Sequence, residues 1–198
     1  DAHCGRHPQH QRIAIWAALN ADGIAALREK GRAAVADTLK RHLAATQDTI
    51  ALPRYWRFTD NLPRNAQAKI AAADFQMAFT VAQTSPVWSK TSSDDETNSE
   101  TFISRVPLDL VYFGGHFATF PLVPGVVELQ WVRNLIAPQP WGKQRIIRIE
   151  NLKYQQFIRP HDEVSVELKY DEGKNKLSFK INNGEHPCAS GRIVFEAV

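Results

Sequence analysis

The chain has 198 residues, 43% hydrophobic and 23% charged, which suits one medium domain or two small ones with a real core. A net charge of +3 is too small to indicate nucleic-acid binding, and the apolar runs are too short to span a membrane. Cys4 and Cys188 have neither a disulfide-framework spacing nor a metal-ligand spacing, and the polar N-terminal residues do not resemble a signal peptide. We therefore expect reduced thiols in a cytoplasmic protein.

The first half of the chain is rich in alanine and predicts a mixed α/β arrangement. Asp22 is the expected N-cap of a helix, and Gly31 is expected to break or end it. In chain order, the expected elements are a strand over 12–20, helical patterns before and after Gly31, a strand over 55–59 and a helix over 70–79.

A polar and acidic segment over 91–101 separates the two halves and predicts a solvated hairpin loop, with flanking strands over 81–90 and 102–108. Residues 121–136 start with Pro and Gly and predict a mainly apolar, buried helix. Four further strands are predicted over 144–158, 163–170, 176–182 and 188–196. A buried helix followed by four antiparallel strands predicts a curved sheet wrapped around the helix.

The residues best suited to chemistry lie between positions 112 and 131. Two glycines precede His116 and permit a close approach of backbone to its imidazole, which titrates near neutral pH. Gly125 opens the helix, whose first N–H groups and positive dipole end can polarise a thioester carbonyl. A base beside such a polariser is what removal of a proton alpha to a thioester requires. A loop histidine held by the backbone would fit the same pattern.

The stretch GGHFATFPLVPGV resembles the GHFP…P…PGV signature of the β-hydroxyacyl-ACP dehydratases, which are hot-dog proteins. The residues in register with it are His116, Phe117, Pro121, Pro124, Gly125 and Val126. The stretches LKYQQFIRPHDEVSVEL and SGRIVF resemble later strands of the same family, so that the resemblance covers roughly residues 84–198. The nearest subgroup is the dehydratase-like proteins of aryl polyene-type polyketide or fatty acid clusters.

This resemblance implies an α+β hot-dog domain over 84–198, an antiparallel sheet around a long central helix. It assigns His116 as the catalytic base and the backbone N–H of Gly125 to the thioester oxygen. Phe117, Pro124 and Val126 are then expected to bind substrate.

One position departs from the family pattern. The family has a catalytic Glu or Asp fourteen positions after the histidine, and here that position is Gln130. A glutamine can orient a hydroxyl or a water, but it cannot be a general acid at neutral pH. Glu128 lies two residues earlier, about 200° around the helix, and should face elsewhere.

Three hypotheses therefore remain open for this half. In the first, the protein dehydrates 3-hydroxyacyl thioesters in fatty acid or polyene biosynthesis, with His116 making both proton transfers and Gln130 positioning the 3-hydroxyl. In the second, it is an acyl thioesterase with water activated near His116. In the third, it binds acyl chains without turnover.

The resemblance also implies the substrate carrier, cofactors and partners of the domain. The substrate would arrive on the phosphopantetheine of an acyl carrier protein, with no metal and no redox cofactor, and no membrane or nucleic acid is expected as a partner. Hot-dog domains of this family pair through their sheets, so we expect a homodimer in which His116 of one subunit meets Gln130 of the other. Four basic residues are candidates for docking an acidic carrier: Arg145, Arg148, Lys153 and Arg159.

The stretch LPRNAQAKI resembles the LPR…GKI motif of adenylate-forming acyl-CoA or aryl-acid ligases. It implies that residues 1–80 are part of the small α/β C-terminal subdomain of such a ligase, with Lys69 as the motif lysine. Ala68 stands where the family has Gly. The match begins part-way into that subdomain, and nothing in the chain resembles the ATP-binding phosphate loop. We expect either a piece of a ligase–dehydratase fusion or a relic or docking module.

Overall fold

The computed structural model describes residues 12–94, 96–115 and 117–196. These residues form two compact units. The first, which we call the α/β unit, contains the chain up to Thr84 together with residues 107–121. The second, the sheet–helix unit, contains residues 85–106 and the chain from Leu122 onward. The assignment of 1–80 to a ligase subdomain and of 84–198 to a dehydratase domain stays a prediction.

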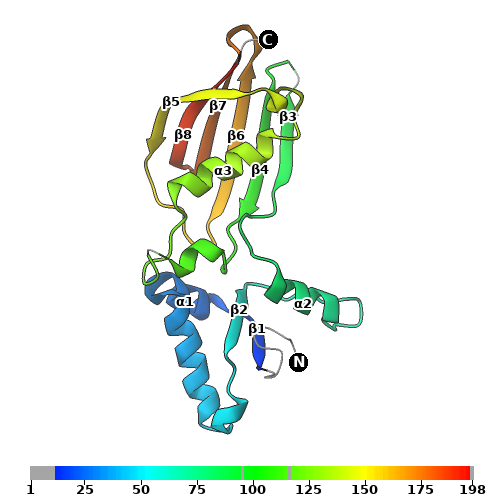
Figure 1. Ribbon diagram of the computed structural model, residues 1–198, viewed down its shortest axis with the longest axis vertical. Coiled ribbons are helices and arrows are strands. Elements are labelled where there is room, and N and C mark those ends of the chain that lie inside the picture. The colour runs from blue at the N-terminus through cyan, green and yellow to red at the C-terminus, as the bar shows by residue number, and fades with distance from the viewer. Residues whose placement is uncertain (1–11, 95, 116, 197–198) are drawn as a thin grey trace. The chain divides into compact units, whose positions relative to one another are not determined.

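The α/β unit is built on a strand–helix–strand motif, β1 (Ala14–Ala18), α1 (Ala21–Ala44) and β2 (Tyr55–Thr59), followed by α2 (Ala72–Thr80). β1 and β2 pair in parallel, with Ala14 opposite Tyr55 (Figure 1). Parallel strands need a long crossover connection, which α1 supplies. The two strands and the helical segments predicted for this half are confirmed.

The start and the middle of α1 are set by two polar or flexible residues. Asn20 is the N-cap, and its Oδ1 accepts a hydrogen bond from the Gly23 N–H at 3.0 Å. The prediction of Asp22 as the N-cap is therefore wrong. Asp22 lies in the first turn, where its negative charge interacts favourably with the helix dipole. Gly31 has φ 80° and ψ 168°, so the predicted break in this helix is confirmed.

The core of the α/β unit brings together side chains from three stretches of the chain. Its buried members are Leu19, Leu27, Val35, Trp56, Phe58 and Leu108. Leu108 comes from residues 107–121, and it is only 2% exposed. This segment therefore shares the core of the α/β unit.

The sheet–helix unit has six antiparallel strands in the order β3-β4-β6-β7-β8-β5, and the helix α3 (Gly125–Ile136) runs across the sheet in Figure 1. The strands are β3 (Ser89–Asp94), β4 (Ser99–Arg105), β5 (Ile146–Tyr154), β6 (Glu163–Asp171), β7 (Lys176–Asn183) and β8 (His186–Phe195). Short 3-10 helices are η1 (Thr49–Ala51), η2 (Val111–Gly114), η3 (Pro140–Lys143) and η4 (Glu172–Lys174). The predicted helix and the last four predicted strands are confirmed.

Sequence reasoning misplaced the first strand of this sheet. It was expected over 81–90, whereas β3 begins at Ser89 and uses polar residues of the segment interpreted as a loop. β3 is an edge strand, and all of its side chains are exposed. Such a strand is held by its backbone pairing with β4 and needs no apolar alternation, so its sequence pattern resembled a loop.

The core of the sheet–helix unit follows from alternation in the central strands. Every second residue of β6 and β7 is buried, which makes one apolar face. Apolar side chains of α3 are buried as well: Val127, Trp131, Val132, Leu135 and Ile136. Burying both surfaces against each other is the main stabilising term for this unit.

The ligase-like loop of the α/β unit places a non-glycine residue in a left-handed conformation. Ala68, at the position where the ligase motif has Gly, has a φ of 59°. Asn65 closes the loop, because its Oδ1 accepts from the N–H groups of Gln67 at 2.9 Å and Lys69 at 3.0 Å. An L-residue pays roughly 1–2 kcal/mol for this conformation, which Gly avoids.

We therefore expect Ala68→Gly to raise the free energy of unfolding by about 0.5–1 kcal/mol, since relief of strain exceeds the added entropy of the unfolded chain. Urea denaturation followed by far-UV circular dichroism measures this change. Ala66→Gly is the matched control, because Ala66 lies in the same loop and is not among the residues with positive φ. It should be neutral or destabilising. Equal effects of the two changes would contradict the argument.

Candidate functional site

The start of α3 presents backbone N–H groups that have no acceptor within the helix. The N-cap is Pro124, whose side chain makes no capping hydrogen bond. The N–H of Val127 donates to the Pro124 carbonyl at 2.8 Å, as expected for a first turn. The N–H groups of Gly125 and Val126 come earlier in the helix and have no intrahelical acceptor. This helix end can therefore bind an oxygen that carries partial negative charge.

Gly125 is needed at this position because of a tyrosine from β5. A Cβ on Gly125 would lie 2.5 Å from ring carbons of Tyr154. The Tyr154 hydroxyl donates to the Gly125 carbonyl oxygen at 2.9 Å. The ring thus covers the helix start and fixes its backbone, and any larger residue at 125 would displace it.

The structure places the other predicted site residues as follows. Val126 is 72% exposed at the start of α3, and Gln130 is exposed one turn later, where its Nε2 donates to Asn134 Oδ1 at 2.8 Å. Phe117 is 48% exposed and belongs to the α/β unit. His116, the expected base, lies outside the described residues.

Glu128 is the residue whose importance sequence reasoning missed. Glu128 faces away from Gln130, as predicted, and this direction points it into the protein interior. Only 3% of the residue is exposed, and its Oε2 has no hydrogen-bond partner among the described residues. Burial raises the pKa of Glu128 to about 7. A signal was available, because Glu128 shares the i, i+3, i+7 stripe of α3 with Trp131 and Leu135.

Two neighbouring groups respond to the Glu128 carboxylate. Burial, and then the negative charge of Glu128, raise the pKa of the Tyr154 hydroxyl. The same two causes, burial first, raise the pKa of the Cys188 thiol to about 11. Cys188 is therefore a buried neutral thiol, not a nucleophile.

Lys69, the ligase-motif lysine, is exposed in the α/β unit. Ala68, which precedes it and replaces the glycine of the motif, adopts the strained left-handed conformation described above. A role in adenylation would need a second domain to supply the nucleotide site. The ligase origin of this unit and the function of Lys69 stay predictions.

Neither metal binding nor membrane insertion is indicated by the residues that the structure describes. In that part of the chain, no three or more His, Cys, Asp or Glu residues are grouped so that they could hold a metal ion. Its helices are also too short or too polar to cross a bilayer. The expected absence of a metal and of a redox cofactor stays a prediction.

Comparison with known proteins identifies the second half of the chain. A family model described as "ApeI-like: ApeI dehydratase" matches residues 91–192. An uncharacterized protein from Erwinia carotovora subsp. atroseptica is 31% identical with a TM-score of 0.50, over 58% of this chain and 98% of that one. The dehydratase heterocomplex ApeI:P from Xenorhabdus doucetiae is 22% identical with a TM-score of 0.52, over 57% of this chain and 99% of that one. No curated protein matches the chain.

These matches bear on the fold and on the class of activity. The antiparallel sheet with its helix is a hot-dog fold, which confirms that prediction for the second half. The family model begins at residue 91 and does not cover the chain before it.

The buried carboxyl of Glu128 makes a prediction about stability. Its pKa rises from 4.5 to about 7 on folding, so the folded state binds more protons than the unfolded state between these values. Stability is then greatest below pH 4.5 for this group and falls by about 3 kcal/mol as the pH passes through 7. Glu128→Gln should remove this loss and be more stable than wild type at pH 8.

Urea denaturation at pH 5 and at pH 8 measures the difference. Glu172→Gln is the control, because Glu172 is an exposed glutamate in η4 of the same unit. It should leave the pH dependence of the wild type unchanged. The prediction is wrong if the wild type and Glu128→Gln lose the same stability between the two pH values.

Proposed function

Because this chain belongs to the ApeI-like dehydratase family, we propose that it converts 3-hydroxyacyl thioesters on an acyl carrier protein into trans-2-enoyl thioesters. The observation that carries the proposal is the start of α3. There the N–H groups of Gly125 and Val126 have no intrahelical acceptor, and Pro124 supplies no cap. They follow His116 in the chain at the spacing of the dehydratase signature. A base and a carbonyl polariser are the two groups that this elimination needs.

In the proposed reaction, His116 removes the proton from C2, next to the thioester carbonyl. The Gly125 N–H holds the carbonyl oxygen while it gains negative charge. The electron pair then forms the C2–C3 double bond, and the C3–O bond breaks. The departing hydroxyl takes the proton back from His116, so one water leaves and the imidazole is restored. Gln130 orients the 3-hydroxyl, since an amide cannot supply the proton.

Phe117, Pro124 and Val126 are proposed to contact the acyl thioester. Two of them have side chains that solvent reaches, because Phe117 is 48% and Val126 72% exposed. Exposed apolar side chains suit contact with an apolar acyl chain. The products fit fatty acid or polyene biosynthesis, in which a reductase or a further condensation would use the enoyl thioester.

Three candidate carrier-docking residues, Arg145 just before β5 and Arg148 and Lys153 on it, differ in their availability. Arg145 pairs with Glu196 at 3.6 Å, and Arg148 pairs with Glu150 at 2.6 Å. Lys153 is exposed on the same strand. An acidic carrier would therefore compete with internal carboxylates for the two arginines.

We expect His116→Ala to lower turnover of 3-hydroxyacyl-ACP by at least 100-fold, because the reaction loses both its base and its acid. Mass spectrometry of the acylated carrier reports the loss of one water from the wild-type reaction. His42→Ala, an exposed histidine in the last turn of α1, is the matched control and should retain full turnover.

Gln130→Glu separates the remaining alternatives. Water loss by the wild type, dependent on His116, supports a dehydratase that works without the usual acid. Release of free acid and unloaded carrier would instead show a thioesterase. Water loss by Gln130→Glu but not by the wild type would show a disabled, acyl-binding site and overturn the proposal.

We further propose that the sheet–helix unit forms a homodimer, with Gln130 of each copy facing the His116 of the other. β5 is an edge strand of the sheet, and it exposes Ile147, Ile149, Leu152 and Tyr154. An exposed apolar edge strand is a surface for pairing with another chain. A second copy offers the same strand, and two antiparallel edges can then hydrogen-bond symmetrically.

The double substitution Ile147→Lys and Ile149→Lys should therefore convert a dimer into a monomer, since it buries two charges in the pairing edge. Light scattering after size exclusion measures the mass, for which the monomer is 22.3 kDa. Ile50→Lys, at a residue 98% exposed in η1, is the control and should remain dimeric. A monomeric wild type would overturn the homodimer. The Xenorhabdus doucetiae structure is described as a heterocomplex, so pairing with a different chain would be tested next.

A further inference from the structure

The segment 107–121, which carries His116 in the sequence, is anchored in the α/β unit. Leu108 and Leu110 are each 2% exposed and Phe113 is 1% exposed, and Leu108 shares the core with Leu27 and Phe58. The N–H of Val111 donates to the carbonyl of Gln83 at 3.0 Å. These contacts fix the stretch before His116.

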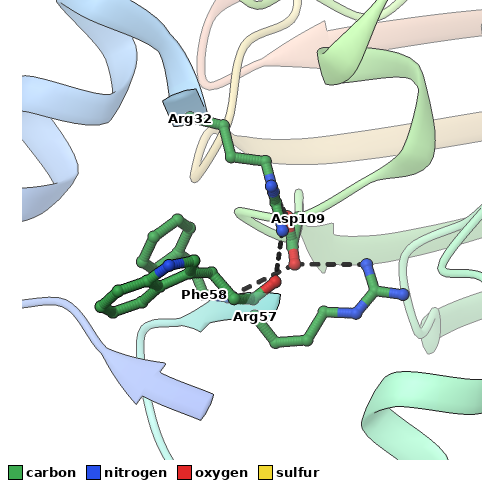
Figure 2. A network of polar contacts seen from close by, with 5 residues as sticks. Arg32, Arg57, Phe58 and Asp109 are labelled. Carbon is green, nitrogen blue, oxygen red and sulfur yellow. Dashed lines mark hydrogen bonds and ion pairs between the residues drawn. The ribbon is translucent and has the colours of Figure 1, made fainter. Parts of the chain in front are cut away.

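The strongest anchor is the carboxylate of Asp109, which is 3% exposed (Figure 2). It accepts from Arg32 Nε at 2.5 Å, from Arg57 Nη1 at 3.3 Å and from the N–H of Phe58 at 3.3 Å. Arg32 belongs to α1, whereas Arg57 and Phe58 belong to β2. Two of the three elements of the strand–helix–strand motif, α1 and β2, therefore converge on one residue, seven positions before His116.

Arg32 is itself held in place by two further contacts. Its Nη2 donates to the carbonyl of Trp56, and its guanidinium lies 5.6 Å from the centre of the Phe58 ring. A guanidinium fixed by a carboxylate, a carbonyl and an aromatic ring has little freedom to move. The orientation of the Asp109 carboxylate is therefore set by the α/β unit.

A second anchor lies on the other side of His116. Gly31, at the break in α1, has a φ of 80°, and a Cβ there would lie 1.7 Å from the carbonyl oxygen of Ala118. Only glycine allows the helix backbone and the segment to approach this closely. Ala118 is two residues after His116. The α/β unit thus contacts this segment both before and after the expected base.

From these contacts we propose that the α/β unit positions the segment 107–121 for dehydration, with Arg32, Arg57 and Asp109 as positioning residues. This inference rests on the proposed function, in which His116 is the base. It gives residues 12–84 a role in the dehydratase itself, different from adenylation and from carrier docking. Apolar packing could bury the segment, but the charged network fixes one orientation of its backbone, because Asp109 must meet all three donors together.

The test compares full-length variants of the network. Asp109→Asn removes both ion pairs, with Arg32 and with Arg57, whereas Arg57→Met removes only the second, and the combination removes both. Arg57→Lys keeps the charge in case Asp109→Asn fails to fold. Arg41→Met is the control, because Arg41 is an exposed arginine of α1, the helix that also carries Arg32. Among the described residues, the Arg41 side chain bonds only to Asp37 and Thr38. Two readouts are taken: kcat and KM for 3-hydroxyacyl-ACP, and hydrogen–deuterium exchange of the peptide 107–121 without substrate.

We expect Asp109→Asn and Arg57→Met to lower kcat about 10- to 100-fold with KM changed less than about threefold, since a small misplacement of a catalytic group lowers the rate while binding persists. The double variant should be no worse than Asp109→Asn alone, because Asp109→Asn already removes the ion pair that Arg57→Met removes. Exchange in 107–121 should be faster in each, while Arg57→Lys recovers part of kcat. A merely structural role would instead lower the folded fraction and leave kcat per folded molecule unchanged.

The two proposals fail in different ways. If the wild type loses water in a His116-dependent manner, but the network variants keep the wild-type kcat and exchange rate, the positioning role is wrong and the dehydratase stands. If the wild type loses no water, the proposed function is wrong. The exchange measurement then decides whether the network holds the segment, and unchanged exchange overturns that as well.

Discussion

A buried carboxylate needs donors on all sides, and Asp109 finds its donors in the side chains and backbone of α1 and β2. Removing either arginine would leave the carboxylate, which is 3% exposed, with one donor fewer, so both arginines contribute to its orientation. This ties residues 107–121 to the α/β unit, although the chain on either side of them belongs to the sheet–helix unit. The organisation of the whole chain depends on that arrangement.

The helix α3 divides its chemistry between its end and its two faces. Its start offers the N–H groups of Gly125 and Val126, and the Tyr154 hydroxyl from β5 donates to the Gly125 carbonyl oxygen there. Its outer face exposes Gln130, and its inner face buries Glu128. A buried glutamate whose Oε2 has no hydrogen-bond partner in the part of the chain that the structure describes destabilises the folded state at neutral pH. The two polar residues therefore lie in different environments: Gln130 is open to solvent, whereas burial of Glu128 makes stability depend on pH.

The sequence predicted elements wherever local physics is decisive. The buried stripe of α3 and the alternation in the last four strands follow from periodicity, and the break at Gly31 follows from glycine itself. It failed where the deciding partner is distant. The polar edge strand β3 is defined by its pairing with β4. The N-cap is a separate and local error: Asn and Asp both cap helices well, so residue type alone did not decide between Asn20 and Asp22. Nothing local distinguishes the acid of Asp109, whose partners lie 77 and 52 residues away.

The ligase-like features and the positioning role occupy different surfaces of the α/β unit, so one does not exclude the other. Lys69 and the strained Ala68 lie in an exposed loop after β2. Arg32 and Arg57 instead reach a buried carboxylate through α1 and through β2 itself. A subdomain recruited only as a relic would have no reason to keep a two-arginine network around an acid from residues 107–121, because an apolar residue at position 109 would pack there at lower cost. The buried ion pairs are therefore better explained by the geometry that they impose on that segment than by the stability that they add.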